Sequence, residues 1–230
     1  MRIGIVGDLH LPFTHPMYRR FVNDVFERNR INKIHFIGDI VDNHAISPSW
    51  EANPNGMSGG DEYRAAKKEL AKWLKDFPKA TVSIGNHDDR AFRAANKAGL
   101  PDDFLKSYKQ VWDTPRWDWN FAHTFDGVLY EHGTGTSGKS AAINRAIQKR
   151  TSLSMGHIHY FAGVQWHTNE TSRIFGLQVG CGIDPQSYAF AYGREFPIRP
   201  VLGCGIVIDG VGHFIPMPCG PGEKYHRRRS

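Results

Sequence analysis

The sequence predicts a layered α/β fold, in which largely parallel central strands are flanked by helices and antiparallel strands are added in the C-terminal third. Two observations carry this prediction. Over the first two thirds of the chain, short apolar runs alternate with helical stripes, as strand–helix–strand crossovers require. The last third instead shows alternating segments punctuated by glycine, such as IDGVGHF, which favour strands and hairpins.

The elements follow in order along the chain. The run 2–7 (RIGIVG) is apolar after Arg2, as expected of a strand buried on both faces, and 16–29 then carries a helical stripe. The other expected helices are 61–77 and 138–149. The other expected strands are 33–38, 80–85, 127–131, 152–156, 173–180, 201–209 and 211–217.

A length of 230 residues with 40% hydrophobic content suits one globular domain, which we predict over residues 1–222. Residues 43–60 show no periodicity, and structureless connections of this length are usually functional lids or disordered segments. This segment is therefore expected to be a long loop insertion. The chain ends in HRRRS, and we expect residues 223–230 to form a basic, solvated tail, with contact to nucleic acid as the alternative.

The composition limits the class of protein. A net charge of +6 and a pI of about 9.3 favour anionic partners, such as phosphorylated substrates or nucleic acid. No apolar run approaches the length of about 18 residues that a membrane span needs. The three cysteines lack CxxC pairing and the N-terminus lacks a signal-peptide pattern, so a reduced, cytoplasmic location is predicted. Nothing in the sequence indicates an obligate protein partner.

Two further segments attract attention. Residues 111–120 (VWDTPRWDWN) hold three tryptophans, expected to pack beneath a loop or, alternatively, to form a wall on which a base stacks. Residues 133–140 (GTGTSGKS) match the phosphate-binding pattern G-x-x-x-x-G-K-S, which would make the protein a P-loop NTPase. That interpretation lacks a convincing second carboxylate, because Asp209 fits a hairpin turn better. Lys139 is then either solvated or a contact to a substrate phosphate.

Five of the predicted strands are followed by residues of the types that ligate metal ions. These residues are Asp8 and His10; Asp39; Asn86 with His87 and Asp88; His132; and His157 with His159. Ligands bind at the carboxyl ends of strands in open α/β sheets, so we expect the five segments to converge. Oxygen and imidazole donors without a thiolate suit Mn²⁺, Fe²⁺ or Zn²⁺. The set is too large for one tetrahedral ion and fits two ions that share a carboxylate.

The motifs GDLH, GDIVDN, GNHD, EHG and GHIH, in this order over residues 8–159, resemble the calcineurin-like metallophosphoesterase superfamily. The resemblance implies a metallophosphoesterase-type fold and hydrolysis of phosphate esters with two divalent ions, Mn²⁺ first, with Fe²⁺, Zn²⁺ or Ni²⁺ as alternatives. It implies a first metal on Asp8, His10 and His159, and a bridging Asp39. The second metal would be held by Asn86, His132 and His157.

The resemblance also implies a mechanism. A hydroxide shared by two metals would attack phosphorus in line, and protonated His87 would give a proton to the leaving oxygen. Asp88 would hold the imidazole of His87 and raise its pKa. Asp42 is expected to orient a ligand histidine by a hydrogen bond.

The sequence departs from the Ser/Thr protein phosphatases of this superfamily. Those enzymes carry an arginine after GDxVD and another before GNH, where this chain has Asn43 and Ile84. Because the bidentate grip of those arginines on phosphate is missing, a phosphoprotein substrate is disfavoured. Arg90 is a candidate replacement, although a charge on a helix surface is the plainer interpretation. Asn43 and His44 open the 43–60 segment and are candidates for substrate contact.

The sequence therefore favours a metal-dependent phosphoesterase acting on nucleotide or nucleic-acid phosphodiesters. The first alternative is a phosphomonoesterase, either a small-molecule or a protein phosphatase. A non-catalytic binding module is disfavoured because the ligand set is intact. A P-loop NTPase using residues 133–140 is the remote alternative, since it explains none of the other four strand ends.

Overall fold

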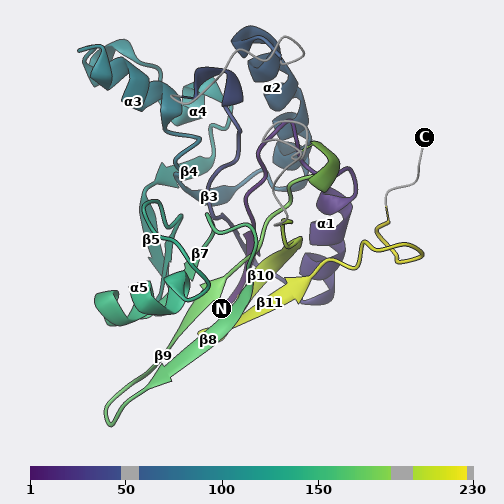
Figure 1. Ribbon diagram of the computed structural model, residues 1–230, viewed down its shortest axis with the longest axis vertical. Helices are drawn as coiled ribbons and strands as arrows, with labels where there is room; N and C mark the ends of the chain where they lie inside the picture. Colours follow the sequence, from purple (N-terminus) through teal and green to yellow (C-terminus); the bar gives the residue numbers. More distant parts are fainter. Residues whose placement is uncertain (48–56, 188–198, 227–230) are drawn as a thin grey trace.

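The computed structural model describes residues 1–47, 57–187 and 199–226. In these residues two β-sheets lie face to face, with helices on their outer sides (Figure 1). The sheet orders are β11-β10-β1-β2-β3-β4 and β5-β6-β7-β9-β8. The first sheet contains β1 (Arg2–Val6), β2 (Lys33–Phe36), β3 (Ala80–Ser83), β4 (Trp117–Asn120), β10 (Gly203–Ile208) and β11 (Val211–Pro216). The second contains β5 (Ala122–Phe125), β6 (Val128–Glu131), β7 (Ser152–Met155), β8 (Gly163–Thr168) and β9 (Arg173–Gln178).

Each sheet has a parallel centre. Strands β1 to β4 pair in parallel, and β10 and β11 add antiparallel strands at one side. In the second sheet β6, β7 and β9 are parallel, with β5 and β8 as antiparallel edges. The carboxyl ends of β1, β2 and β3 therefore meet at one edge of the first sheet, and those of β6 and β7 at one edge of the second.

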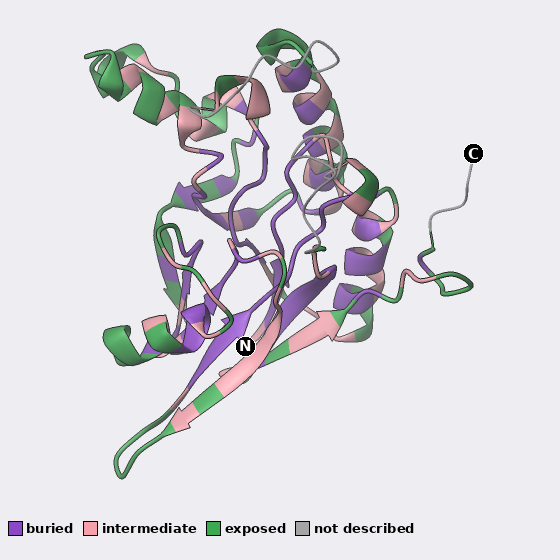
Figure 2. Cartoon of the chain, viewed as in Figure 1, coloured by how far each residue is buried: buried purple, intermediate pink, exposed green. Residues whose placement is uncertain are grey.

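The helices are α1 (Tyr18–Arg28), α2 (Gly59–Asp76), α3 (Arg90–Lys97), α4 (Tyr108–Val111) and α5 (Ala141–Lys149), with short 3-10 turns at His44–Ile46 (η1) and Asp102–Phe104 (η2). Helices α1 and α2 cover the outer face of the first sheet through side chains such as Phe21 and Trp73. Helix α5 covers the outer face of the second sheet. A third apolar cluster, including Ile5 and Phe175, fills the space between the sheets. The layers are therefore helix, sheet, sheet, helix (Figure 2).

The fold class is confirmed, and each strand and helix expected from the sequence has an observed counterpart at nearly the same position. The division of the strands between two sheets was not predicted. The strands β4, β5 and β8 and the helix α4 were also not predicted, and α3 was anticipated only as a helix surface at Arg90. The single-domain organisation over residues 1–222 stays a prediction.

The segment 43–60 is not structureless at its ends. Residues 44–46 form the turn η1, and Glu62 ties that turn to α2 by accepting the backbone N–H groups of His44 at 2.7 Å and Ala45 at 2.9 Å. Ser58 caps α2 by accepting the N–H of Asp61. The predicted loop 43–60 therefore contains a short turn near its start, and its last two residues belong to α2, while 48–56 lies outside the described residues.

The tryptophan cluster packs inward. Trp117 is fully buried and donates its indole N–H to the carbonyl of Phe77, and Trp119 donates to Thr114 Oγ1. Trp112 is also buried. The packing interpretation is correct, and the stacking wall for a base is wrong, because no face of these rings is open.

The predicted tail begins with residues that dock on α1. Tyr225 is buried, packs on Phe21, and donates its hydroxyl to Asp24 Oδ2 at 2.7 Å. Lys224 donates to the same carboxylate at 2.6 Å. Tyr225 is therefore not solvated as predicted, whereas Lys224 is exposed, and 227–230 lie outside the described residues. No helix in the described ranges combines the length and the apolar character that a membrane span requires.

Candidate metal centre

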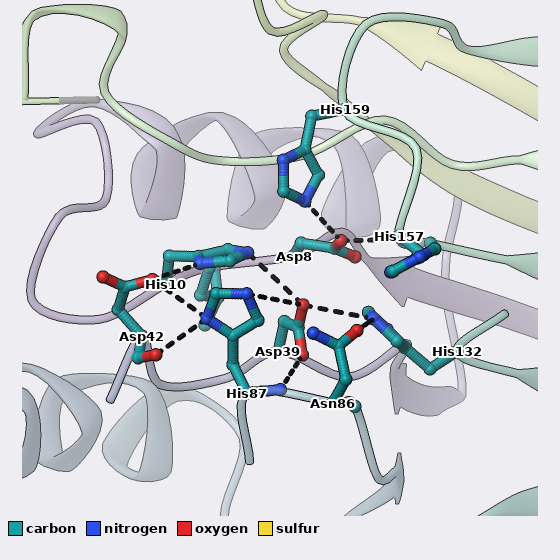
Figure 3. Close-up of polar contacts among 12 residues, drawn as sticks. Asp8, His10, Asp39, Asp42, Asn86, His87, His132, His157 and His159 are labelled. Atoms are coloured by element: carbon teal, nitrogen blue, oxygen red, sulfur yellow. Dashed lines mark hydrogen bonds and ion pairs between the residues drawn. The ribbon is translucent and has the colours of Figure 1, made fainter. Parts of the chain in front are cut away.

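The segments that follow β1, β2, β3, β6 and β7 meet between the two sheets. They bring together nine polar side chains, from Asp8, His10, Asp39, Asp42, Asn86, His87, His132, His157 and His159 (Figure 3). Strands from both sheets contribute, so the centre is built at the seam of the two sheets rather than along one of them.

Glycines in the motifs let the backbone come close to the carboxylates. A Cβ at Gly85 would overlap Asp39 Oδ1, and a Cβ at Gly156 would overlap Asp8 Oδ1. Gly133 has a φ of 98°, so the chain turns away directly after His132 in a conformation that favours glycine. These glycines are therefore part of the construction of the centre.

The first cluster consists of Asp8, His10, Asp39 and His159, whose ligand atoms lie within 4.8 Å of one another. His159 Nε2 is 3.0 Å from Asp8 Oδ2, and His10 Nε2 is 3.5 Å from Asp39 Oδ2. Asp8, His10 and Asp39 are almost completely buried. The backbone N–H of His157 donates to Asp8 Oδ2 at 2.8 Å, which fixes the orientation of that carboxylate.

The second cluster consists of Asp39, His132 and His157, also within 4.8 Å. His132 Nε2 is 3.1 Å from Asp39 Oδ2 and 3.1 Å from Asn86 Oδ1, so the amide oxygen of Asn86 joins the cluster. The Nδ1 of His132 lies 3.0 Å from the carbonyl of Ile37 and donates to it, which turns Nε2 toward the cluster. Asp39 belongs to both clusters.

The donor set fits divalent metal ions. Among the described residues, Asp8 Oδ1 and His10 Nε2 are buried without a hydrogen-bond partner, an arrangement that is costly unless a cation is bound. Carboxylate, amide and imidazole donors are the set that Mn²⁺, Fe²⁺ and Zn²⁺ accept. The residues present therefore suit the two ions that the sequence analysis expected.

Burial and neighbouring charges act in opposite directions on the pKa values of the carboxylates and imidazoles in the centre. Burial opposes ionisation of Asp39, but His132 and His87 outweigh it and hold the pKa of Asp39 well below its usual range. Burial likewise opposes the charge on His132, yet Asp39 and Asp8 raise its pKa to about 10. The pKa of His10 is lowered by burial and by His87, and that of His157 by burial and by His132. The lowered pKa values of His10 and His157 favour the uncharged imidazole, which is the form that binds a metal ion.

Asp42 holds two imidazoles of the centre. Its Oδ1 lies 2.7 Å from His10 Nδ1 and 3.1 Å from His87 Nδ1, and its carbonyl accepts from His87 Nδ1 at 2.7 Å. The expected hydrogen bond from a histidine of the centre to Asp42 is therefore present. These contacts leave Nε2 of His87 facing the centre, 3.9 Å from Asp39 Oδ2.

Asp88 does not hold His87, contrary to the prediction. Its carboxylate accepts from the backbone N–H of Gly85 at 2.9 Å and of Val41 at 3.3 Å. Burial, followed by the charge of Asp39, raises the pKa of Asp88 to about 7. Asp88 thus fastens the loop after β3 to the loop after β2, and the contact to His87 is made by Asp42 instead.

The family model described as calcineurin-like phosphoesterase matches residues 1–177. The chain belongs to this family. It is accordingly a phosphoesterase, a hydrolase that acts on phosphoester bonds, and its family is dinuclear and metal-dependent. The predicted family, fold class and reaction class are confirmed.

Several solved structures resemble the phosphoesterase at low identity. An archaeal phosphodiesterase is 13% identical, with 94% of this chain and 100% of that chain covered and a TM-score of 0.46. Yfce, a phosphoesterase from E. coli, is 13% identical, with 94% and 93% covered and a TM-score of 0.44. Vps29 from Entamoeba histolytica is 14% identical, with 90% and 86% covered and a TM-score of 0.41. A comparison with curated proteins gives no match.

The four candidates for substrate contact have different surroundings in the structure. Arg90 is not a plain surface charge, because its Nη2 is 3.2 Å from His87 Nε2 and its Nη1 donates to the carbonyl of Asp42. Asn43 donates to the carbonyl of His87 at 2.9 Å, which gives it a structural contact. The backbone of His44 is held by Glu62. Lys139 is exposed in the loop before α5.

Two backbone hydrogen bonds close turns at the loop 133–140 of the phosphoesterase. The N–H of Thr136 bonds to the carbonyl of Gly133, and the N–H of Ala141, the first residue of α5, bonds to that of Gly138. The loop leaves the centre at His132 and leads into α5, as expected of a helix N-terminal turn.

Sequence reasoning missed one supporting residue. Gln178, at the end of β9, is buried and donates through Nε2 to the carbonyl of Gly156, so it braces the segment that carries His157 and His159. A polar residue at the end of an apolar strand was the available signal, and it resembles the signal that identified the metal-type ligands.

Proposed function

We propose that this phosphoesterase hydrolyses phosphodiesters at a centre of two divalent ions that share Asp39. The observation that carries the proposal is the membership of Asp39 in both ligand clusters. Oδ2 of Asp39 lies 3.5 Å from His10 Nε2 in one cluster and 3.1 Å from His132 Nε2 in the other, so this oxygen faces both clusters, while Oδ1 accepts from the backbone N–H of His87 at 2.8 Å. Asp8, His10 and His159 would hold the first ion, and Asn86, His132 and His157 the second.

Ions bound there would polarise the phosphoryl oxygens and activate the attacking water. The remaining work belongs to the chain's own residues. His87 is buried on one side and directs Nε2 toward the centre, so we assign it the proton that the leaving oxygen needs. Asp42 keeps that ring in orientation through Nδ1. Arg90, beside Nε2 of His87, is placed to contact a phosphate oxygen.

A diester is favoured over a monoester by the charge that the protein itself supplies. A phosphodiester carries one negative charge, whereas a phosphomonoester dianion carries two. Among the described residues, the guanidinium of Arg90 lies beside the ring of His87, whereas that of Arg93 is bound to the backbone carbonyl of Asn86. The positions of the two arginines typical of protein phosphatases hold Asn43 and Ile84. Phosphomonoester hydrolysis, on a small molecule or a phosphoprotein, is the second candidate.

We propose Mn²⁺ as the working ion, with Fe²⁺, Zn²⁺ or Ni²⁺ as substitutes. The centre mixes hard carboxylate and amide oxygens with imidazole nitrogens and has no thiolate, which suits these ions better than a purely oxygen-binding or thiolate-binding ion. The proposed partner is a phosphate-ester substrate, such as a nucleotide or nucleic acid, and the proposed location is the cytoplasm.

The test uses the metal-stripped protein with and without added Mn²⁺. Rates are measured on bis-nitrophenyl phosphate, a diester, and on nitrophenyl phosphate, a monoester, for the wild type and Asp39→Asn. Asp118→Asn, an exposed carboxylate on β4, is the matched control. We expect Mn²⁺-dependent turnover that is faster on the diester, is retained in Asp118→Asn and is lost in Asp39→Asn. A faster monoester would select the second candidate, and no Mn²⁺-dependent turnover would refute both.

A further inference from the structure

A cleft beside the metal centre is lined mainly by cations from one helix. It has a volume of about 390 Å³ and is lined by Ile46, Arg90, Arg93, Ala94 and Lys97. The three cations are spaced i, i+3 and i+7 along α3, which puts them on one face of that helix. None of these lining residues is acidic, and although Arg93 Nε lies 3.5 Å from Asp89 Oδ2, the lining keeps a net positive charge that suits an anion.

Arg90 joins this cleft to the metal centre. Its Nη2 lies 3.2 Å from Nε2 of His87, and its Nη1 donates to the carbonyls of Asp42 at 2.8 Å and Asn43 at 3.0 Å. The guanidinium is thereby held at the catalytic histidine while its helix extends away. A ligand in the cleft would be continuous with a substrate at the centre.

The opposite side of α3 anchors the helix. Phe92 stacks on Tyr108 with ring centroids 4.3 Å apart, and Tyr108 stacks in turn on Trp119 at 5.4 Å. The hydroxyl of Tyr108 also donates to Asp89 Oδ1 at 2.7 Å. Most of α3 is exposed (Figure 2). With the aromatic side fixed to the body of the protein, the other face of the helix carries the cations.

The row of cations is longer than one phosphate group. Arg90 and Lys97 are seven positions apart, which corresponds to about 10 Å along the helix axis. A strand in a duplex carries a phosphate about every 3.4 Å of helix axis, and the phosphates of an extended single strand lie farther apart, so the row spans about two of them. A small diester at the metal centre would reach Arg90 and would leave Arg93 and Lys97 without contact.

We propose that the cationic face of α3 binds the phosphodiester backbone of a single-stranded nucleic acid whose scissile phosphate lies at the metal centre. Arg93 and Lys97 would contact successive phosphates beyond the one that reacts. A single row of charges follows a single backbone, as in grooves that bind single strands. The inference rests on the proposed diesterase function and names its substrate class.

Lys97→Ala is the variant that tests the inference. Lys97 is exposed at the far end of α3 from His87, whereas Arg93 also donates to the carbonyl of Asn86 and is therefore a less clean choice. Lys149→Ala is the matched control, because Lys149 is likewise exposed at the C-terminal end of a helix, α5, which leads away from the centre. Kinetics are measured on a short single-stranded oligonucleotide, on bis-nitrophenyl phosphate and on a nucleoside triphosphate.

A phosphate contact on a single strand contributes a salt slope of about 0.7, so losing one weakens binding about eightfold at roughly 0.05 M salt and about twofold at roughly 0.3 M. We expect Lys97→Ala to raise KM for the oligonucleotide by these factors and to leave the small diester within about twofold. Lys149→Ala should change neither substrate. The shrinking of the effect with salt is a readout that a merely structural defect would not produce.

Other outcomes overturn the inference. An unchanged oligonucleotide KM in Lys97→Ala, or an equal loss on both diesters, would do so. If Lys97→Ala raised KM only for the nucleoside triphosphate, the ligand of the cationic face would be a nucleotide polyphosphate and not a nucleic acid. Failure of the proposed function itself is distinguishable, because then no ester is turned over with Mn²⁺. In that case fluorescence anisotropy of the labelled oligonucleotide decides, since equal affinities of wild type and Lys97→Ala contradict the cationic face.

Discussion

Replacing Asp42 by asparagine tests which carboxylate orients the histidines of the centre. The change keeps the size of the side chain and removes the charge that faces His10 Nδ1 at 2.7 Å and His87 Nδ1 at 3.1 Å. Both rings would lose a charge-assisted partner, although the carbonyl of residue 42 would still accept from His87.

The expected loss follows from the role of such partners. Removing the carboxylate that orients a metal-binding histidine typically costs about 10–100-fold in metal affinity or activity. Asp42 supports two rings, so we expect Asp42→Asn to lower kcat/KM on bis-nitrophenyl phosphate by about 100-fold, the upper end of that range. Mn²⁺ affinity should fall as well, because His10 is an expected ligand of the first ion. Steady-state kinetics over a Mn²⁺ titration measure both quantities.

Asp88→Asn is the matched control, since it makes the same chemical change next to His87 in sequence. Asp88 accepts from two backbone N–H groups and contacts neither ring, so its replacement should lower stability by about 1–3 kcal/mol and kcat/KM by less than about tenfold. Urea unfolding measures the stability. Nearly wild-type activity in Asp42→Asn, together with a large activity loss and unchanged stability in Asp88→Asn, would refute the reasoning.

Three further predictions concern other parts of the structure. Gly156→Ala would drive a Cβ into Asp8 Oδ1, so we expect Mn²⁺ binding in a calorimetric titration to be lost at one site, and normal binding would contradict the close approach. Tyr225→Phe removes a hydrogen bond to Asp24 and should lower the free energy of urea unfolding by about 1 kcal/mol. Because Lys224 and Tyr225 lower the folded pKa of Asp24, this contribution should be complete above about pH 4 and fade as the pH falls further, and an effect that grows in acid would be evidence against it. Lys139→Ala should leave diester hydrolysis within about twofold, and a larger loss would restore the loop 133–140 as a phosphate contact.

Predictions of strands and ligand motifs from the sequence are most accurate where the local pattern of a segment agrees with its position in the fold. Strands such as β1 are apolar after their first residue because they are buried on both faces, and the ligand motifs follow them directly. The strand β4 was missed because its residues WDWN lie within the tryptophan-rich segment, which was interpreted as loop packing. The pairing of strands into two sheets is a non-local property, and no pattern within one segment encodes it.

The difference between local pattern and non-local contact also explains why the sequence assigned to Asp88 the contact with His87 that Asp42 makes. Asp88 is the neighbour of His87 in sequence, but its side chain turns back toward the backbone of Gly85 and Val41. Asp42 reaches His87 because β2 and β3 are parallel neighbours, so the segments after them lie side by side. Contacts between different strand ends depend on strand order, whereas the ligand types at each end can be recognised from the sequence alone.

The most direct test of the central claim is anomalous X-ray diffraction from crystals of the Mn²⁺-loaded protein. Two ions that share a carboxylate are expected about 3.5–4 Å apart. The account predicts two anomalous peaks at that separation, with Asp39 between them, Asp8, His10 and His159 on one peak, and Asn86, His132 and His157 on the other. A single peak, or two peaks that do not share Asp39, would contradict it.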